Sequence, residues 1–470
     1  MFLRRSITAV TAATAICAVT APAASAAGSA PWTTGTSPSG TAKTSATAAS
    51  SISGSSMPGT SISGASVSRT SVSTTSLSAS ASGAKTPKAL YGKADPKYDG
   101  VWRQSMALLA LDAAGAEPAR TAVGWLVRQQ CDDGSFTAHR ADPGTACDGK
   151  KTPGDTNATG AAVQALSAVG GQEETVRKAL AWLGSVQNED GGWGYNPGGP
   201  SDANSVSVVI GAHTAAGKKP EKVTKDGKSP YDALTSFQLG CDAKDAERGA
   251  FAYQPGKDGK LAANDDATAA AVLAGTGSGL LAERKPEDRP VEPMDCGKEE
   301  KDGSKPLARD EAADAGAAHL TSVLKKNGGH LLAVTPGTEP APDYANTADA
   351  VIALAAGGHR TEARKSLDWL AKKLDSWDKA ENDPAAIAGV MLAVHATGGD
   401  AATLKGTKLL DRLVATGPRP ARMPGGKATG GEAEEDGSGD VLRWSLLGAG
   451  LAAGAGIGVL ISARRKRQDR

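Results

Sequence analysis

Residues 178–193 read Lys178-Ala-Leu-Ala-Trp182-Leu-Gly-Ser-Val-Gln187-Asn-Glu-Asp-Gly191-Gly-Trp193. The first part carries a Trp–Leu pair among good helix formers, and we expect this helix to end at Gln187. An acidic, Gly-rich turn follows and delivers a second aromatic side chain at Trp193. The segment therefore predicts a helix, a tight turn and an aromatic anchor in close succession.

Copies of this pattern recur through the middle of the chain, and such a repeat decides the fold. The copy before residue 178 keeps the aromatic, Gln and Gly positions, whereas the later copies are progressively altered. These other copies are Trp125 to Gln130 with Gly134-Ser-Phe136; Leu234 to Gln238 with Gly249-Ala-Phe251; His319-Leu320 with Leu324, Gly328 and His330; and Trp369-Leu370 alone.

Each copy is followed by a smaller, Ala-rich helix with its own start signal. Asp, Asn and Thr at these starts can accept hydrogen bonds from the free N–H groups of the first helical turn. The starts are Asp155-Thr-Asn157, Asp202-Ala-Asn204, Asn264-Asp-Asp266, Tyr344-Ala-Asn346 and Asn382-Asp383-Pro.

Both kinds of helix together predict an all-α fold of about twelve helices, arranged as six hairpins. Such a number of hairpins favours a closed (α/α)6 toroid over an open solenoid, with the Ala-rich helices on the inside. The expected helices are 101–114, 118–130, 156–169, 173–187, 203–216, 229–239, 265–282, 310–326, 345–356, 360–376, 383–397 and 401–415.

The segment from Trp182 to Trp193 resembles the QW repeat of squalene and oxidosqualene cyclases. The whole arrangement, over roughly residues 100 to 415, is similar to the α/α toroid of terpenoid cyclases, protein prenyltransferase β-subunits and intrinsic-factor-like cobalamin carriers. The resemblance implies the toroid fold. It implies little about activity, because the motif is structural in that family: its Gln caps a helix end and stacks on the aromatic.

The resemblance places Asp266 where bacterial squalene cyclases carry their catalytic acid. Their motif D-x-D-D-T-A matches Asn264-Asp-Asp266-Ala267-Thr-Ala, in which two flanking acids are replaced by Asn264 and Ala267. An acid that protonates an alkene needs neighbours that tune and reprotonate it. Asn157 and Asn204 hold the equivalent place in sibling repeats, so we interpret Asp266 as a helix-capping residue rather than a catalytic one.

Other cyclase and prenyltransferase features are missing from the sequence. Only 4% of the residues are aromatic, whereas carbocation chemistry needs aromatic faces. No D-x-C zinc motif, phosphate loop or nucleophile elbow occurs, so we predict no metal site, no cofactor and no confident catalytic residue. With a net charge of +1, binding to nucleic acid is not expected either.

The preferred function is therefore non-catalytic binding of a small molecule or partner at one rim of the ring. A terpene cyclase or prenyltransferase-like enzyme, an architectural cell-surface spacer and a cobalamin-carrier-like protein remain alternatives. Each candidate contact also has a purely structural interpretation, as packing or capping. The ligand-binding candidates are Trp193, Tyr195, Asn196, Asn204, His213, Phe251, Tyr253, Asp266 and Tyr344.

Four cysteines remain once Cys17 is removed with the N-terminal signal. An even number in an exported chain favours disulfides. Each sequential pair brackets one polar insertion, which predicts the bridges Cys131–Cys147 and Cys241–Cys296.

The two ends of the chain predict export and membrane anchoring. Residues 1–27 are typical of a secretory signal peptide, 28–86 of a Ser/Thr/Ala-rich disordered stalk, and 87–417 form the repeat domain. An acidic, Gly-rich linker (418–440) leads to an apolar span at 441–463 and a basic tail at 464–470.

The basic tail predicts a single-pass protein of the cell membrane with its C-terminus in the cytoplasm and its ring outside. The predicted span also carries small residues at every fourth position, a spacing that allows two such helices to pack together. The residues at this spacing, which make dimerisation possible, are Gly450, Gly454 and Gly458.

Overall fold

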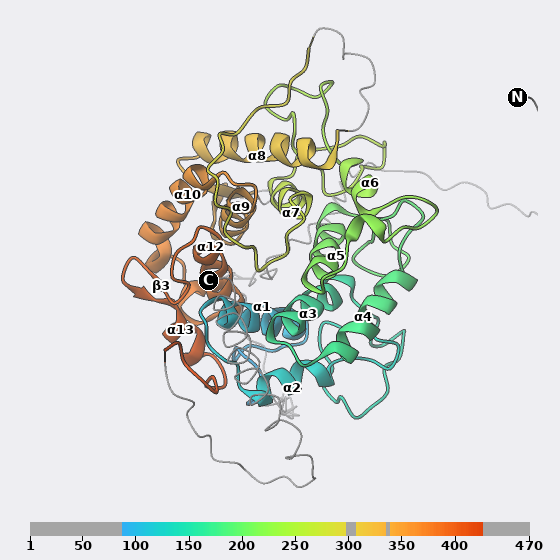
Figure 1. Cartoon of the computed structure of the whole chain (residues 1–470), viewed down its shortest axis with the longest axis vertical. Helices are drawn as coiled ribbons and strands as arrows, with labels where there is room; N and C mark the ends of the chain where they lie inside the picture. Colours follow the sequence, from blue (N-terminus) through green and yellow to red (C-terminus); the bar gives the residue numbers. More distant parts are fainter. Residues whose placement is uncertain (1–86, 298–306, 335–338, 426–470) are drawn as a thin grey trace, which may run out of the picture. The chain divides into compact units, whose positions relative to one another are not determined.

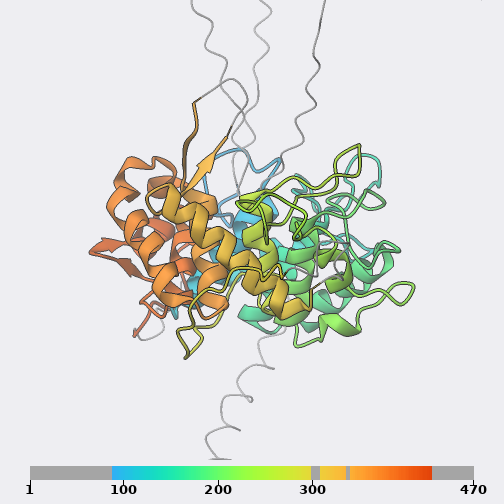
Figure 2. The ribbon, with the colours of Figure 1, turned by 90° about the horizontal axis from the view of Figure 1, so that it is seen from above.

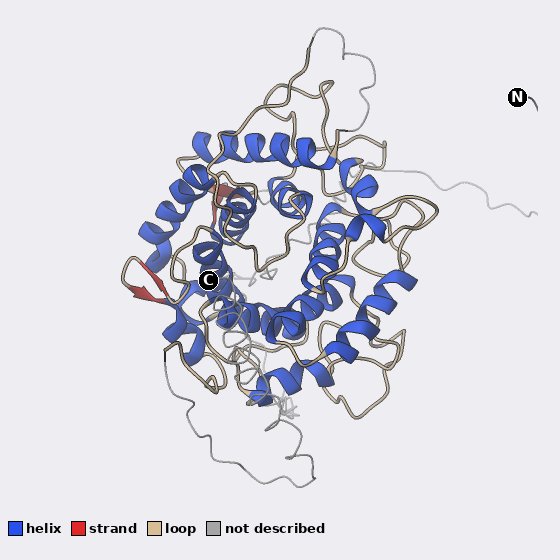
Figure 3. Cartoon of the chain, viewed as in Figure 1, coloured by secondary structure: helices blue, strands red, loops and turns tan. Residues whose placement is uncertain are grey.

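The computed structural model describes residues 87–297, 307–334 and 339–425, and these residues are predominantly α-helical (Figure 3). The predicted signal peptide, stalk, membrane span and basic tail lie outside them, as does most of the 418–440 linker. Within the described part of the chain, no helix is both long and apolar enough to cross a membrane.

Six helices form a closed inner ring, because each packs against the next and the last packs against the first (Figure 1). All six belong to the Ala-rich type that the sequence analysis placed inside. They are α1 (Gly100–Ala113), α3 (Thr156–Val169), α5 (Ala203–Ala215), α7 (Asp265–Gly275), α9 (Tyr344–Ala356) and α12 (Pro384–Ala396).

A second set of helices lies outside the ring. Each outer helix packs on the inner helix that comes before it in the chain. This pairing agrees with the predicted hairpins. The outer helices are α2 (Arg120–Arg128), α4 (Glu173–Ser185), α6 (Pro230–Thr235), α8 (Arg309–Lys326), α10 (Arg360–Lys373) and α13 (Leu409–Ala415).

Short elements complete the described residues. Strands β1 and β2 pair antiparallel and project from one face of the ring (Figure 2), and β3 and β4 form a second small hairpin. Their bounds are β1 (Leu331–Ala333), β2 (Ala341–Asp343), β3 (Thr403–Leu404) and β4 (Thr407–Lys408), with the single turns η1 (Pro220–Lys222), η2 (Leu374–Ser376) and α11 (Lys379–Asn382).

The start signals of the inner helices act as predicted, as side-chain caps. Asp155 accepts from the Ala158 backbone N–H, Asp202 from Ser205 and Asn264 from Ala267. Each cap satisfies an N–H group that the first helical turn leaves free.

The Gln of the repeat joins one outer helix to the next. Gln187 Nε2 donates to the Gly191 carbonyl of its own turn (2.8 Å) and to the Val223 carbonyl beyond it (3.1 Å). Gln130 and Gln238 make the equivalent pair of bonds, reaching carbonyls in α4 and α8. The motif therefore ties neighbouring hairpins together, which explains its place in a ring built from repeats.

Four details of the prediction are wrong. Helix α7 ends at Gly275 instead of 282, α6 spans only Pro230–Thr235, and residues 403–408 form a β-hairpin where a helix was expected. In the fourth repeat copy, Leu331 rather than His330 takes the aromatic position. The Leu331 N–H bonds Thr347 Oγ1, as the Phe136 N–H bonds Thr159 Oγ1.

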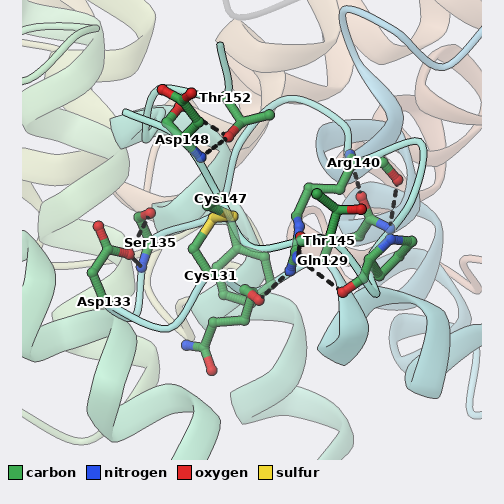
Figure 4. Close-up of a disulfide and its surroundings, with 12 residues drawn as sticks. Gln129, Cys131, Asp133, Ser135, Arg140, Thr145, Cys147, Asp148 and Thr152 are labelled. Carbon is green, nitrogen blue, oxygen red and sulfur yellow. Dashed lines mark hydrogen bonds between the residues drawn. A yellow bond between two sulfur atoms is a disulfide. The ribbon is translucent and has the colours of Figure 1, made fainter. Parts of the chain in front are cut away.

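Both predicted disulfides are present, Cys131–Cys147 and Cys241–Cys296. The first closes a loop that Arg140 also secures (Figure 4). The buried Arg140 guanidinium donates to four backbone carbonyls, so the loop is held by a bridge and by a cation at its centre. The accepting carbonyls belong to Arg128, Gln130, Pro143 and Thr145.

Candidate functional site

A narrow pocket lies inside the ring, between α3, α5, α7 and α9. It encloses about 460 Å³ of space between atoms, including the part that opens to solvent. Its walls are mainly aliphatic, and its polar side chains are few. The lining residues are Gln164, Ser207, Val208, Asp266, Ala269, Ala270, Leu273, Gly279, Leu280, Asp349 and Ile352.

The segment that follows α7, residues 276–289, closes one end of this pocket, and we call it the strap. It turns into the ring directly after α7 (Figure 1). The Leu280 N–H donates to Gln164 Oε1 (2.7 Å), while Gln164 Nε2 donates to the Val208 carbonyl (3.1 Å). A Cβ on Gly279 would lie 2.5 Å from Gln164 Oε1, so any larger residue here would displace the Gln164 side chain. Gln164 thus fixes the strap against α3 and α5.

The far end of the strap is anchored on the α9–α10 turn. The Arg289 N–H donates to the Gly358 carbonyl (2.8 Å), and the Arg289 guanidinium forms a paired contact with Asp314. Thr361 bonds Asp288 through both its N–H and its hydroxyl. Because both ends are held, the strap gives the pocket a fixed floor.

The open end of the pocket lies at the N-terminal ends of the inner helices and carries acceptor groups. Asp266 is in the first turn of α7, and its Oδ2 accepts a hydrogen bond from Asn204 Nδ2 on α5 (2.8 Å). Asp349 projects from α9 into the same pocket. Both carboxylates are engaged in polar or electrostatic contacts. Two acidic side chains therefore face a mostly aliphatic space.

Asp266 is not the helix cap that the sequence analysis took it to be. Asn264 holds that position, since its Oδ1 accepts from the Ala267 N–H (2.8 Å). Asp266 instead lies on the face of α7 that lines the pocket, together with Ala269, Ala270 and Leu273. The turn of the helix thus aims its carboxylate at the interior of the ring.

Asn204 completes this arrangement from the neighbouring helix. It is only 2% exposed and stands one turn before Ser207 and Val208, which line the pocket. Its amide nitrogen is used by Asp266, and its Oδ1 is buried without a hydrogen-bond partner. A buried acceptor of this kind is costly unless something donates to it.

Tyr195 and Tyr253 stand at the rim beside the carboxylates that cap α3 and α5. The Tyr195 hydroxyl bonds Asp155, and the Tyr253 hydroxyl bonds Asp202. Burial raises the pKa of both tyrosines, and the adjacent carboxylates raise it further. Burial also raises the pKa of Asp155. These pairs support the caps, and they bring two of the predicted contacts to one rim.

Three predicted contacts are buried in the walls instead of lining the pocket. Trp193 is fully buried and its Nε1 donates to the Leu183 carbonyl (2.7 Å), and Phe251 is 1% exposed. His213 packs beside Trp193, with ring centroids 6.4 Å apart, and neither ring nitrogen has a partner. Burial lowers the pKa of His213 to about 4.

The remaining two candidates lie away from the pocket. Asn196 is exposed on the loop after Trp193. Tyr344 stacks on Trp377 and lies against Trp369, with ring centroids 5.2 Å apart in each case. Of the nine predicted contacts, only Asp266 therefore lines the pocket, and Asn204 is joined to it by a hydrogen bond.

Sequence reasoning missed Asp349, Ser207 and Gln164. For Asp349 a signal existed, because it is a carboxylate in the middle of an Ala-rich helix predicted to line the ring. No such signal marked Gln164, whose role depends on the strap that follows α7. Among the described residues, no group of three or more His, Cys, Asp or Glu side chains is placed to hold a metal ion.

A comparison with protein-family models finds no match, and neither does a comparison with curated proteins. Among solved structures, the chain is similar to ent-copalyl diphosphate synthase from Streptomyces platensis, with 15% identity and a TM-score of 0.40 over 64% of this chain. It spans half of that synthase, 50% of its length. It is also similar to a protein from Actinoplanes, with 16% identity and a TM-score of 0.39, covering 67% of this chain and 95% of the other. At this level of similarity, neither structure assigns an activity.

Proposed function

We propose that this protein is a binding module, displayed outside the cell membrane, that takes a small ligand into the ring pocket without catalysing a reaction on it. The observation that carries the proposal is the pocket itself. It is lined by aliphatic side chains, floored by the anchored strap and edged by Asp266 and Asp349. A concave, mostly apolar site with a few converging polar groups is the usual form of a ligand site.

The size of the pocket supports a small ligand. Only about 30 Å³ of the pocket is open to the centre of a water-sized molecule, far less than the roughly 300–1,000 Å³ of sites for drug-sized molecules. No aromatic side chain is among its described lining residues. A cyclase uses such faces to steady carbocations, so the lining favours binding over cyclisation.

The bonding of Asp266 also favours binding. Its Oδ2 accepts a hydrogen bond from Asn204, so only the other carboxyl oxygen could carry a proton for donation. A catalytic acid would need a donor geometry and a group that returns its proton. The nearest acid along the chain, Asp265, faces His319 (3.1 Å) and not the pocket.

Display outside the membrane is supported by the two disulfides, which persist in oxidising compartments. In this proposal residues 1–27 direct export, 441–463 anchor the protein and 464–470 remain in the cytoplasm. Protease added to intact cells should remove the ring domain and leave the tail protected. A ring protected until the cells are lysed would contradict this topology.

Binding is tested by measuring the unfolding temperature of the full chain with n-hexanol, n-hexylamine and hexanoate. A ligand that binds only the folded state raises this temperature. We expect at least one of the three to do so, and Ala270→Leu, which fills the pocket, to abolish the rise. Ala181→Leu on the exposed face of α4 is the matched control and should keep it. If no compound stabilises the protein, or if Ala270→Leu responds like the wild type, the proposal fails.

Catalysis is tested by incubating the full chain with squalene and with prenyl diphosphates and analysing the products. We expect none. Turnover that Asp266→Asn abolishes would show that the pocket is an active site.

A further inference from the structure

We infer that the ring pocket binds a primary ammonium group carried on a slim aliphatic chain. The inference rests on the proposed function, since it names the ligand class of the same pocket.

The walls suit an unbranched methylene chain. Ala269, Ala270 and Leu273 of α7 face Ile352 of α9, and Leu280 of the strap closes the floor. Small aliphatic side chains leave a slot that is narrow and favourable for apolar groups. Methylated ammonium groups are usually held by aromatic cages, and the described lining offers no aromatic face.

The polar side chains in and beside the pocket are bonded to one another, to the backbone or to the strap. Ser207 Oγ donates to the Ala203 carbonyl (2.7 Å), and Asn204 Nδ2 donates to Asp266 (2.8 Å). Gln164 is committed on both sides, to Val208 and to Leu280. Ser207 therefore offers a ligand the lone pairs of its hydroxyl oxygen, while each of the two amide groups uses one of its two N–H donors in these bonds.

The acceptors include one that is left without a partner. Asn204 is 2% exposed, and its buried Oδ1 receives no hydrogen bond, although its nitrogen touches the pocket carboxylate Asp266. Such an atom marks a place where a donor is missing. Asn204 is not among the residues that line the pocket, so it enters the site only through its bond to Asp266.

Charge selects the kind of donor. Asp266 and Asp349 are both acidic, and no Lys or Arg is among the described lining residues. An anion is repelled there, while a cation gains from the low dielectric of the interior.

An ammonium group is compact and carries three donors, whereas a guanidinium is broad and planar. A divalent cation would need about six oxygen ligands, more than these two carboxylates provide. The primary ammonium fits the width and the charge of the pocket together.

Two sources share this chemistry: a free alkylamine and a lysine side chain of a polypeptide. The experiment is isothermal titration of the full chain with n-hexylamine at pH 7, where it is protonated, beside n-hexanol, hexanoate and Nα-acetyl-lysine methylamide. We expect hexylammonium to bind at least tenfold more tightly than hexanol, and hexanoate not to bind. If hexylammonium and the lysine derivative bind with equal affinity, the natural ligand can be a lysine side chain of a polypeptide. If only hexylammonium binds, the natural ligand is a free alkylamine.

The variants test the two carboxylates. The double substitution Asp266→Asn and Asp349→Asn keeps the shape and the acceptor for Asn204, and should weaken hexylammonium at least tenfold while leaving hexanol unchanged. Asp265→Asn makes the same charge change one residue away, on the side that faces His319, and should not alter affinity. Equal binding of hexanol and hexylammonium, or an unchanged affinity of the double variant, would overturn the ammonium inference. The proposed function would survive either result, because it requires only that Ala270→Leu blocks binding.

Discussion

At the scale of single residues, the repeat depends on glycines that no other residue can replace. Gly134, Gly191 and Gly249 have φ values of +96°, +86° and +80°, and each lies against the backbone of the following hairpin. A Cβ on Gly191 would lie 2.4 Å from the Ser229 carbonyl oxygen. The same position therefore combines a left-handed conformation with a close approach between repeats.

Gly191→Ala should lower the free energy of unfolding by about 2 kcal/mol or more, because strain and a backbone clash add. Gly184→Ala, in the exposed face of α4 with no atom nearby, should instead raise it by roughly 0.5–1 kcal/mol. Urea unfolding of both variants measures the difference. If both substitutions change the free energy of unfolding equally, the turn at Gly191 accommodates a Cβ and the account is wrong.

His213 is a second residue-scale feature, and it makes stability depend on pH. Burial lowers its pKa to about 4, and Lys218 adds to the effect, whereas an unfolded His titrates near 6.5. Between these values the unfolded chain binds a proton that the folded chain does not. The free energy of unfolding therefore falls as the pH drops from 6.5 to 4, by up to ~3 kcal/mol for this group.

His213→Phe keeps a ring beside Trp193 and removes the titration. Relative to the wild type, this variant should gain stability steadily as the pH falls from 6.5 towards 4. Comparing the two proteins at each pH cancels the contribution of other groups, including Asp155 and Asp202, whose raised pKa values act in the opposite sense. A constant difference between pH 7 and pH 5 would contradict the account.

At the scale of elements, the strap shows where prediction from sequence stops. The inner and outer helices could be predicted because caps, Ala content and the Gln–turn–aromatic repeat are local signals. The Ala-rich pattern also predicted a helix that continues to residue 282. In the structure α7 ends before Gly277, whose φ of +74° is not helical. The sequence of residues 276–289 does not predict that this segment turns into the ring, because its hydrogen-bond partners Gln164 and Gly358 are distant in the sequence.

The candidate site was missed for the same reason. The cyclase-like motif pointed to Asp266, and the comparison of repeat copies pointed to Asn204, but the direction of their side chains depends on ring closure. The β3–β4 hairpin was missed because Lys405 adopts φ 44° before Gly406, a turn that an amphipathic pattern does not reveal.

Gln164→Leu should loosen the strap. It leaves the Leu280 N–H without its Gln164 partner and removes the side-chain bond to the Val208 carbonyl, at a cost of about 1–3 kcal/mol. Trypsin should then cleave faster after Arg284, which is exposed in the strap. Gln172→Leu, at a helix start where the side chain makes no capping bond, serves as control. Cleavage at the wild-type rate would show that Gln164 does not hold the strap.

At the scale of the whole molecule, closure of the ring joins residues from both ends of the described domain. Helix α12 packs on α1, and Tyr91, fully buried, donates from its hydroxyl to the Pro418 carbonyl (2.7 Å). The Gly92 N–H donates to the Thr416 carbonyl (2.9 Å). Opening this seam would leave the first and last hairpins each without one neighbour, and stability in such a repeat depends on contacts between neighbours. We therefore expect the sealed ring to unfold as one unit.

Tyr91→Ala should therefore destabilise helices far from the seam. We expect a loss of about 3–5 kcal/mol from the cavity, and hydrogen exchange should quicken in α5 and α7 as much as in α1. Tyr98→Ala, at a tyrosine that is 70% exposed, should change little. Faster exchange confined to α1 and α13 would show that the hairpins open independently.

The central claim is that the pocket between α3, α5, α7 and α9 is a ligand site for an aliphatic ammonium. A crystal structure of the full chain with n-hexylamine tests it most directly. The account predicts the nitrogen within hydrogen-bond distance of Asp266 and Asp349, and the methylene chain along Ala270 towards Leu280. An amine bound only elsewhere on the protein, with the pocket unchanged, would contradict it.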